Sequence, residues 1–165
     1  MCNESKCLKS FWYYVPDGIG WLEFAPNVLE HLARYRQLKA RDLEAGGQLF
    51  YTEAAEGHLR VEAITGPRKT DMRSRYFYKP DRSAELAEID ELFTFNLHYI
   101  GDWHTHPESI ARPSRNDLVA ITDIFNSSVR RGEGFLLIII GTSSIERSLS
   151  VSWCNDKIVG LERMA

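Results

Sequence analysis

Two histidines and an aspartate are the residues of this chain with the clearest capacity for chemistry. One residue separates His104 from His106, and Asp117 follows eleven residues after the second histidine. Successive side chains of a strand point to opposite faces, so an extended His-x-His segment aims both imidazoles at one point. A carboxylate on the next element can complete a set of three nitrogen and oxygen ligands, and catalytic zinc sites combine such a set with a water in the fourth position. The spacing therefore predicts a hydrolase centre with one Zn²⁺ per chain and a bound water.

The segment that carries the aspartate also has a purely structural interpretation. Ser114 and Asp117 have the spacing of a capping box, and an apolar helical run follows them. Such a pair satisfies backbone N–H groups at the start of a helix and needs no chemistry. The two interpretations are compatible, because a helix N-terminus fixes Asp117 in place and favours negative charge nearby. Spacing alone does not decide between a cap and a ligand.

Hydrolysis of an amide also needs a group that moves a proton from the attacking water to the leaving amine. A glutamate beside the water can do this and contributes roughly 10²–10⁴-fold in rate. Glu44 is the best candidate, because Gly46 and Gly47 follow it at a helix-to-strand junction and glycines let a backbone approach a site closely. Nothing in the local pattern places Glu44 beside the histidines.

Composition limits the class of protein. The chain has 165 residues, of which 44% are hydrophobic and 26% charged, and a net charge of −3. These values are ordinary for a globular protein and argue against nucleic acid or a membrane surface as partner. No apolar run reaches the roughly 18 residues of a membrane span. Three scattered cysteines suggest free thiols rather than a disulfide framework, and the N-terminus lacks a signal-peptide pattern. We therefore expect a cytoplasmic protein with one domain over residues 1–165.

Hydrophobic periodicity predicts interspersed strands and helices, which favours a mixed α/β fold with helices covering a sheet. Strands are expected at 11–15, 21–24, 48–52, 58–64, 98–103, 135–140, 149–154 and 158–161. Helices are expected from 26 to about 43, from 81 to 93 and from 117 to 125. In the second helix, Leu86, Ile89, Leu92 and Phe93 share the face that should point inward. The basic segment from 68 to 80 is expected to be irregular.

Three segments taken together resemble the JAB/JAMM (MPN-plus) metalloprotease family. They are Glu-Ala-Gly-Gly at 44–47, His-Thr-His-Pro at 104–107, and Ser-Arg-Asn-Asp at 114–117, with the family's seven residues between the second histidine and the serine. The similarity spans about residues 40–142. It implies a zinc peptidase or isopeptidase on a single-domain fold with a curved mixed sheet flanked by helices.

The resemblance also implies a role for each motif residue. His104, His106 and Asp117 would bind zinc together with a water. Glu44 would act as general base and then as general acid. Ser114 would orient the tetrahedral oxyanion, which zinc also stabilises as a Lewis acid.

Within the family, the short form with its segments 71–76 and 101–103 looks most like bacterial JAB proteins. Some of these accompany conjugation genes of CBASS anti-phage operons and release a nucleotidyltransferase from its covalent target. The implied partner is a protein with a conjugated C-terminal tail, ubiquitin-like or nucleotidyltransferase. One departure is Phe50-Tyr51, where many members have a glycine, and it concerns the shape of the pocket near Glu44.

Two other classes of function compete with the hydrolase. A non-catalytic MPN scaffold would have no use for a metal-ready set of side chains. A nucleobase deaminase needs a Pro-Cys-x-x-Cys pair together with its His-x-Glu, and the sequence lacks that cysteine pair. The basic segment 68–79 is compatible with a solvated loop or with a substrate-facing flap.

Overall fold

Eight strands of the computed structural model, which describes residues 8–127 and 134–165, form one curved sheet. Their bounds are Phe11–Val15 (β1), Gly20–Phe24 (β2), Gly46–Ala55 (β3), His58–Ile64 (β4), His98–Thr105 (β7), Phe135–Ile140 (β8), Leu149–Cys154 (β9) and Ile158–Leu161 (β10). They lie in the order β1-β2-β4-β3-β7-β8-β9-β10. Met72–Ser74 (β5) and Phe77–Lys79 (β6) form a separate hairpin. The helices are Pro26–Arg34 (α1), Arg82–Phe93 (α2), Arg115–Ser127 (α3) and Ile145–Ser148 (α4).

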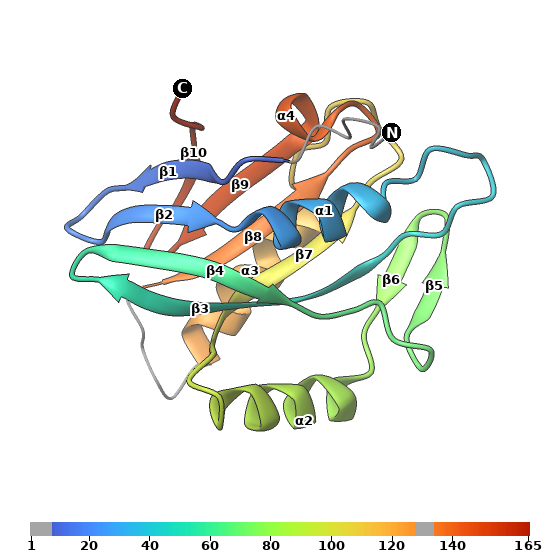
Figure 1. Ribbon diagram of the computed structural model, residues 1–165. Coiled ribbons are helices and arrows are strands. Elements are labelled where there is room, and N and C mark those ends of the chain that lie inside the picture. The colour runs from blue at the N-terminus through green and yellow to red at the C-terminus, as the bar shows by residue number, and fades with distance from the viewer. Residues whose placement is uncertain (1–7, 128–133) are drawn as a thin grey trace, which may run out of the picture.

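The sheet is mixed and nearly closed. β2 pairs with β4 and β7 with β8 in parallel, whereas β3 pairs with β4 and β7 in antiparallel fashion. The strong curl in Figure 1 brings the edge strands β1 and β10 toward each other. Tyr13 forms a bridge with Arg163, and the Met164 N–H donates to the Trp12 carbonyl over 2.8 Å. The curved mixed sheet flanked by helices, expected from the sequence, is confirmed.

Both faces of the sheet are covered, and the strand β8 shows this most clearly. All six of its residues are buried. Leu136, Ile138 and Ile140 join the core cluster that α1 covers, and Phe135, Leu137 and Ile139 join the cluster under α3. A strand that is buried on both faces reads as a continuous apolar run, which is why 135–140 was predicted correctly as a central strand.

Helix α1 ends nine residues earlier than the sequence suggested. The expected end was near Leu43, but the helix stops at Arg34. Tyr35, at the end of the helix, still packs against the core, but Leu38 and Leu43 do not reach it, since they are 60% and 45% exposed. The buried residue of this stretch is polar, and the Gln37 amide donates to the backbone carbonyl of Asp42. Residues 35–45 therefore form an irregular approach to β3.

Helix α2 begins where predicted, but its buried face matches the predicted one only in part. The Asp81 carboxylate caps it by accepting from the N–H groups of Ser83 and Ala84. Of the four residues expected to point inward, Ile89 and Leu92 are half-buried, whereas Leu86 and Phe93 are 63% and 47% exposed. The buried residue of the helix is Glu85. The reason is a charge pairing that helical periodicity does not reveal. The guanidinium of Arg68 forms ion pairs with Glu85 and Glu88 and so determines which side of α2 faces the protein.

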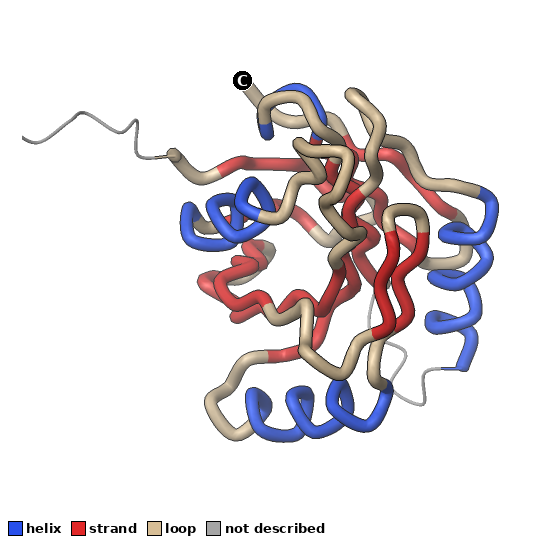
Figure 2. Tube along the Cα trace, turned by 90° about the vertical axis from the view of Figure 1, so that its right-hand side faces the viewer, coloured by secondary structure: helices blue, strands red, loops and turns tan. Residues whose placement is uncertain are grey.

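The expectation of irregular structure from 68 to 80 was wrong, because this segment contains the β5–β6 hairpin. In Figure 2, which looks from the side of the hairpin, the hairpin stands in front of the curved sheet with helices at the periphery. Contacts to a distant segment hold it, since the N–H of Glu44 donates to the Ser74 carbonyl over 2.7 Å. No helix in the described part of the chain has the length and apolar character needed to cross a membrane.

Candidate metal centre

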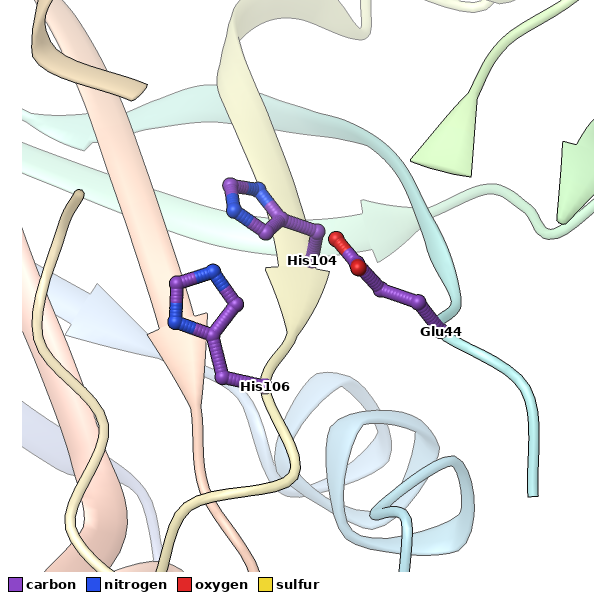
Figure 3. Close-up of side chains that lie close together, drawn as sticks. All are labelled: Glu44, His104 and His106. Carbon is purple, nitrogen blue, oxygen red and sulfur yellow. The ribbon is translucent and has the colours of Figure 1, made fainter. Parts of the chain in front are cut away.

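The two motif histidines lie at the end of β7, and Glu44 lies next to them, two residues before β3 begins (Figure 3). The antiparallel register pairs Gly46 with His104, which brings the residue two before Gly46 to the histidine pair. One ligand atom from each of Glu44, His104 and His106 lies within 4.8 Å of the others. Because metals such as zinc bind imidazole nitrogen and carboxylate oxygen, this donor set fits a divalent cation.

Asp117 adds a second carboxylate from the first turn of α3. Its Oδ1 lies 3.0 Å from Nε2 of His104, and its Oδ2 lies 3.5 Å from Nε2 of His106. Ser114 and Asp117 also cap each other's backbone, with Ser114 N–H to Asp117 Oδ2 at 2.6 Å and Asp117 N–H to Ser114 Oγ at 3.2 Å. The capping interpretation is therefore confirmed. The cap also places the Asp117 carboxylate beside both histidines, which is compatible with the ligand interpretation.

The backbone at Glu44 is held on both sides by the β5–β6 hairpin. Its N–H donates to Ser74, and its carbonyl accepts from Nε of Arg73 over 2.6 Å. A side chain at Gly46 would place its Cβ 2.4 Å from the Tyr78 ring, so glycine is needed for β6 to approach this closely. Glu44 itself is only 8% exposed. The site is thus built where a hairpin and two sheet strands meet.

The hairpin contacts give the basic segment a role that the sequence interpretation did not include. The Arg75 guanidinium donates to the backbone carbonyls of Lys39 and Ala40, as Arg73 does to that of Glu44. These arginines fasten the 39–44 loop rather than extending only into solvent. The sequence contains no local signal for these contacts, because Arg73 lies in β5 and Arg75 in the turn that follows it. Neither a solvated loop nor a substrate flap alone describes them.

The seven residues between the histidine pair and Ser114 are tied to the end of β8. The N–H of Thr142 donates to the Glu108 carbonyl over 2.8 Å, and that of Ser143 to the Ser109 carbonyl over 3.1 Å. A Cβ at Gly141 would lie 2.5 Å from the Glu108 oxygen, so this position accepts only glycine without a shift. These contacts hold the backbone of the loop between His106 and Ser114 in one conformation.

Phe50 and Tyr51, the departure from the family pattern, lie away from the histidines. They pair with Tyr99 and His98, at the opposite end of β7 from His104. Phe50 is fully buried with its ring 6.2 Å from that of Tyr99. These two residues consequently pack where β3 pairs with the first residues of β7, and they do not alter the surroundings of Glu44.

The site gives its carboxylates different protonation behaviour. Burial raises the pKa of Glu44 to about 7, with His104 lowering it and Asp117 raising it. Burial would also raise the pKa of Asp117, but hydrogen bonds from His104 and Ser114, together with the charge of His104, hold it below its ordinary value. Burial lowers the pKa of His106, as does the neighbouring His104. Near neutral pH, Asp117 is an anion and His106 is neutral, which is how metal ligands bind.

Comparison with known proteins supports the assignment made from the motif. A protein named CD-NTase/cGAS isopeptidase from Escherichia coli (strain TW11681) is 27% identical over 135 residues, which are 80% of this chain and 79% of that protein. Its namesake from Vibrio cholerae serotype O1 is 30% identical over 118 residues, 70% and 72% of the two chains. "Probable metalloprotease y4qB" of Sinorhizobium fredii is 33% identical over 104 residues, 60% and 63% of the two chains.

The fold has a counterpart among solved structures. The solution structure of protein DSY2949 from Desulfitobacterium hafniense superposes with a TM-score of 0.55 over 79% of this chain and 82% of that one, at 20% identity. The family model described as prokaryotic homologs of the JAB domain matches residues 26–154, a span that contains Glu44, both histidines and Asp117. The chain therefore belongs to the prokaryotic JAB-domain family.

Proposed function

We propose that this protein is a zinc-dependent isopeptidase that hydrolyses the amide bond after the C-terminus of a conjugated protein. One observation carries the proposal: Glu44 is distant from the histidine pair in the sequence but lies beside it in the structure. Asp117 contacts both imidazoles at the same place. Two imidazoles and two carboxylates in one partly buried place are more than a structural role requires. The relatives named isopeptidase and probable metalloprotease support the same reaction class.

In this proposal the two carboxylates have separate tasks. His104, His106 and Asp117 would hold one zinc ion, which would supply Lewis acidity and lower the pKa of a bound water toward neutrality. The Glu44 carboxylate accepts a proton from the attacking water and delivers it to the leaving amine nitrogen. A group whose pKa lies near the working pH is most effective in this task, and burial raises that of Glu44 to about 7.

Ser114 is the proposed donor to the oxyanion that forms when the amide carbonyl is attacked. Its Oγ accepts from the Asp117 N–H, which holds the hydroxyl beside the ligand carboxylate. The side chain is exposed at the start of α3, where a substrate can reach it. A fixed donor of this kind stabilises developing negative charge without reorganisation.

The proposed substrate is a protein whose C-terminal tail is joined to a target through an amide bond. The relatives' printed name points to a CD-NTase, a nucleotidyltransferase, as the conjugated protein. We extend this to the present chain and place it in CBASS anti-phage defence, with a ubiquitin-like conjugate as the other candidate. The same fold used as a non-catalytic scaffold would cleave neither.

Removal of the metal should abolish cleavage. We expect a chelator to stop hydrolysis of a nucleotidyltransferase fused through its C-terminus to a reporter, because the attacking water would lose its activation. About one equivalent of zinc per chain should restore the rate, measured by gel or mass spectrometry. The same assay with a ubiquitin-like protein in place of the nucleotidyltransferase shows which of the two conjugates is cleaved faster. Full activity in the chelator, with no zinc left by elemental analysis, would exclude the zinc mechanism.

A further inference from the structure

The side chain of Thr105, between the two motif histidines, contacts the backbone beside Glu44. Its Oγ1 accepts a hydrogen bond from the Ala45 N–H over 3.0 Å and donates to Oε1 of Gln37 over 3.0 Å. Thr105 is fully buried and Gln37 is 2% exposed. The strand alternation that turns His104 and His106 to the metal site turns Thr105 to the opposite side, into the protein.

The hydroxyl takes the place of a backbone carbonyl at the last pair of the β3–β7 ladder. The Thr105 N–H donates to the Ala45 carbonyl over 2.8 Å, as in a regular antiparallel pair. The return bond from the Ala45 N–H goes to the threonine side chain instead. The next N–H, that of His106, points to the opposite neighbour and donates to the Ile140 carbonyl at the end of β8, as expected for a strand that lies between two others. The hydroxyl thus extends the ladder to the residue that follows Glu44.

Gln37 connects this point to two further segments. Its Nε2 donates to the Arg75 carbonyl over 2.8 Å and to the Asp42 carbonyl over 3.2 Å. One amide group therefore joins the end of β7, the turn of the β5–β6 hairpin and the loop that leads to Glu44. All three segments surround the proposed general base, yet Gln37 lies outside the motif.

We propose that Gln37 and Thr105 are positioning residues that fix the Glu44 carboxylate relative to the histidine pair. The inference rests on the proposed function, since it assigns a purpose to two residues of that same site. Neither side chain is part of the ligand group, and both act through the backbone at residue 45. Small misplacement of a reacting group can cost about 10²-fold in rate. Loss of the hydroxyl should therefore lower kcat more than it changes KM or zinc content.

The test compares Thr105→Val with Thr105→Ser in the zinc-loaded full chain. Valine keeps the shape of threonine but removes the hydroxyl, whereas serine keeps it. We expect Thr105→Val to lower kcat by about 10- to 100-fold at unchanged KM and zinc content, and Thr105→Ser to restore most of the rate. Thr52→Val removes a hydroxyl near the far end of β3, where it donates to Glu62, and should leave kcat unchanged.

A double-variant comparison separates positioning from general damage. In a Glu44→Gln background, Thr105→Val should cause little further loss, because the group it positions is already gone. An equal fractional loss in both backgrounds, loss of zinc, or a wild-type kcat in Thr105→Val would overturn the inference. Gln37→Met repeats the test from the other partner if the valine variant is too unstable, and wild-type kcat there overturns it too. A fully active Glu44→Gln would instead overturn the proposed function, and this inference with it.

Discussion

Replacing Glu44 by glutamine is expected to lower kcat by about 10²–10⁴-fold, the usual contribution of a general base. Glutamine keeps the size of the side chain but cannot accept the proton of the attacking water. Zinc content and substrate affinity should stay near those of the wild type, because the proposed ligands and the substrate contacts are untouched. Single-turnover cleavage of a tail fusion, with zinc measured in the same sample, gives both quantities.

The matched control for this variant is Glu53→Gln, an exposed position on β3, the strand that follows Glu44. It removes one negative charge from β3 without touching the site and should leave turnover unchanged. If Glu44→Gln retained a near wild-type rate, another group would have to move the proton. If it lost zinc instead, Glu44 would be a ligand rather than the base.

Replacing Asp117 by alanine is expected to weaken zinc binding by at least about 100-fold. Loss of a residue that only supports a ligand already costs roughly 10–100-fold in metal affinity, and loss of the ligand itself should cost more. Activity should disappear with the metal. Zinc affinity is measured by competition with a chromophoric chelator, and cleavage is followed at saturating zinc.

Two controls separate the ligand role of Asp117 from its capping role. Asp123→Ala removes an exposed aspartate from α3 itself and should leave zinc affinity unchanged. Ser114→Ala breaks the cap, which costs about 0.5–2 kcal/mol of stability, yet should retain zinc. Equal zinc affinity in Asp117→Ala and the wild type would mean that Asp117 serves only as a helix cap.

Most of the strands could be predicted because their signals are local. The hairpin at 11–24 is marked by two aromatic and apolar runs around Pro16-Asp17-Gly18, and β8 by an unbroken apolar run. The errors arose where distant polar contacts decide the structure. Gln37 binds carbonyls that a longer α1 would have displaced, and Arg68 selects the buried face of α2 through Glu85. Hydrophobic periodicity contains no information about either contact.

The candidate site shows the same division. The histidine pair follows from strand alternation, and the Ser114–Asp117 cap from helix-start chemistry, so both could be predicted locally. The place of Glu44 depends on the pairing of Gly46 with His104 across a long sequence separation. Only the composite motif and its family resemblance indicated that proximity. Gln37 gave no signal, because a single glutamine after a helix belongs to no motif.

The central claim is that His104, His106 and Asp117 bind the metal while Glu44 stands beside it as the base. A crystal structure of the zinc-loaded protein, with anomalous data at the zinc absorption edge, tests this most directly. We expect one zinc ion at about 2.0–2.2 Å from one nitrogen of each histidine and one oxygen of Asp117, with Glu44 beyond bonding distance. Zinc bound by Glu44 in place of Asp117, or held elsewhere on the protein, would contradict the account.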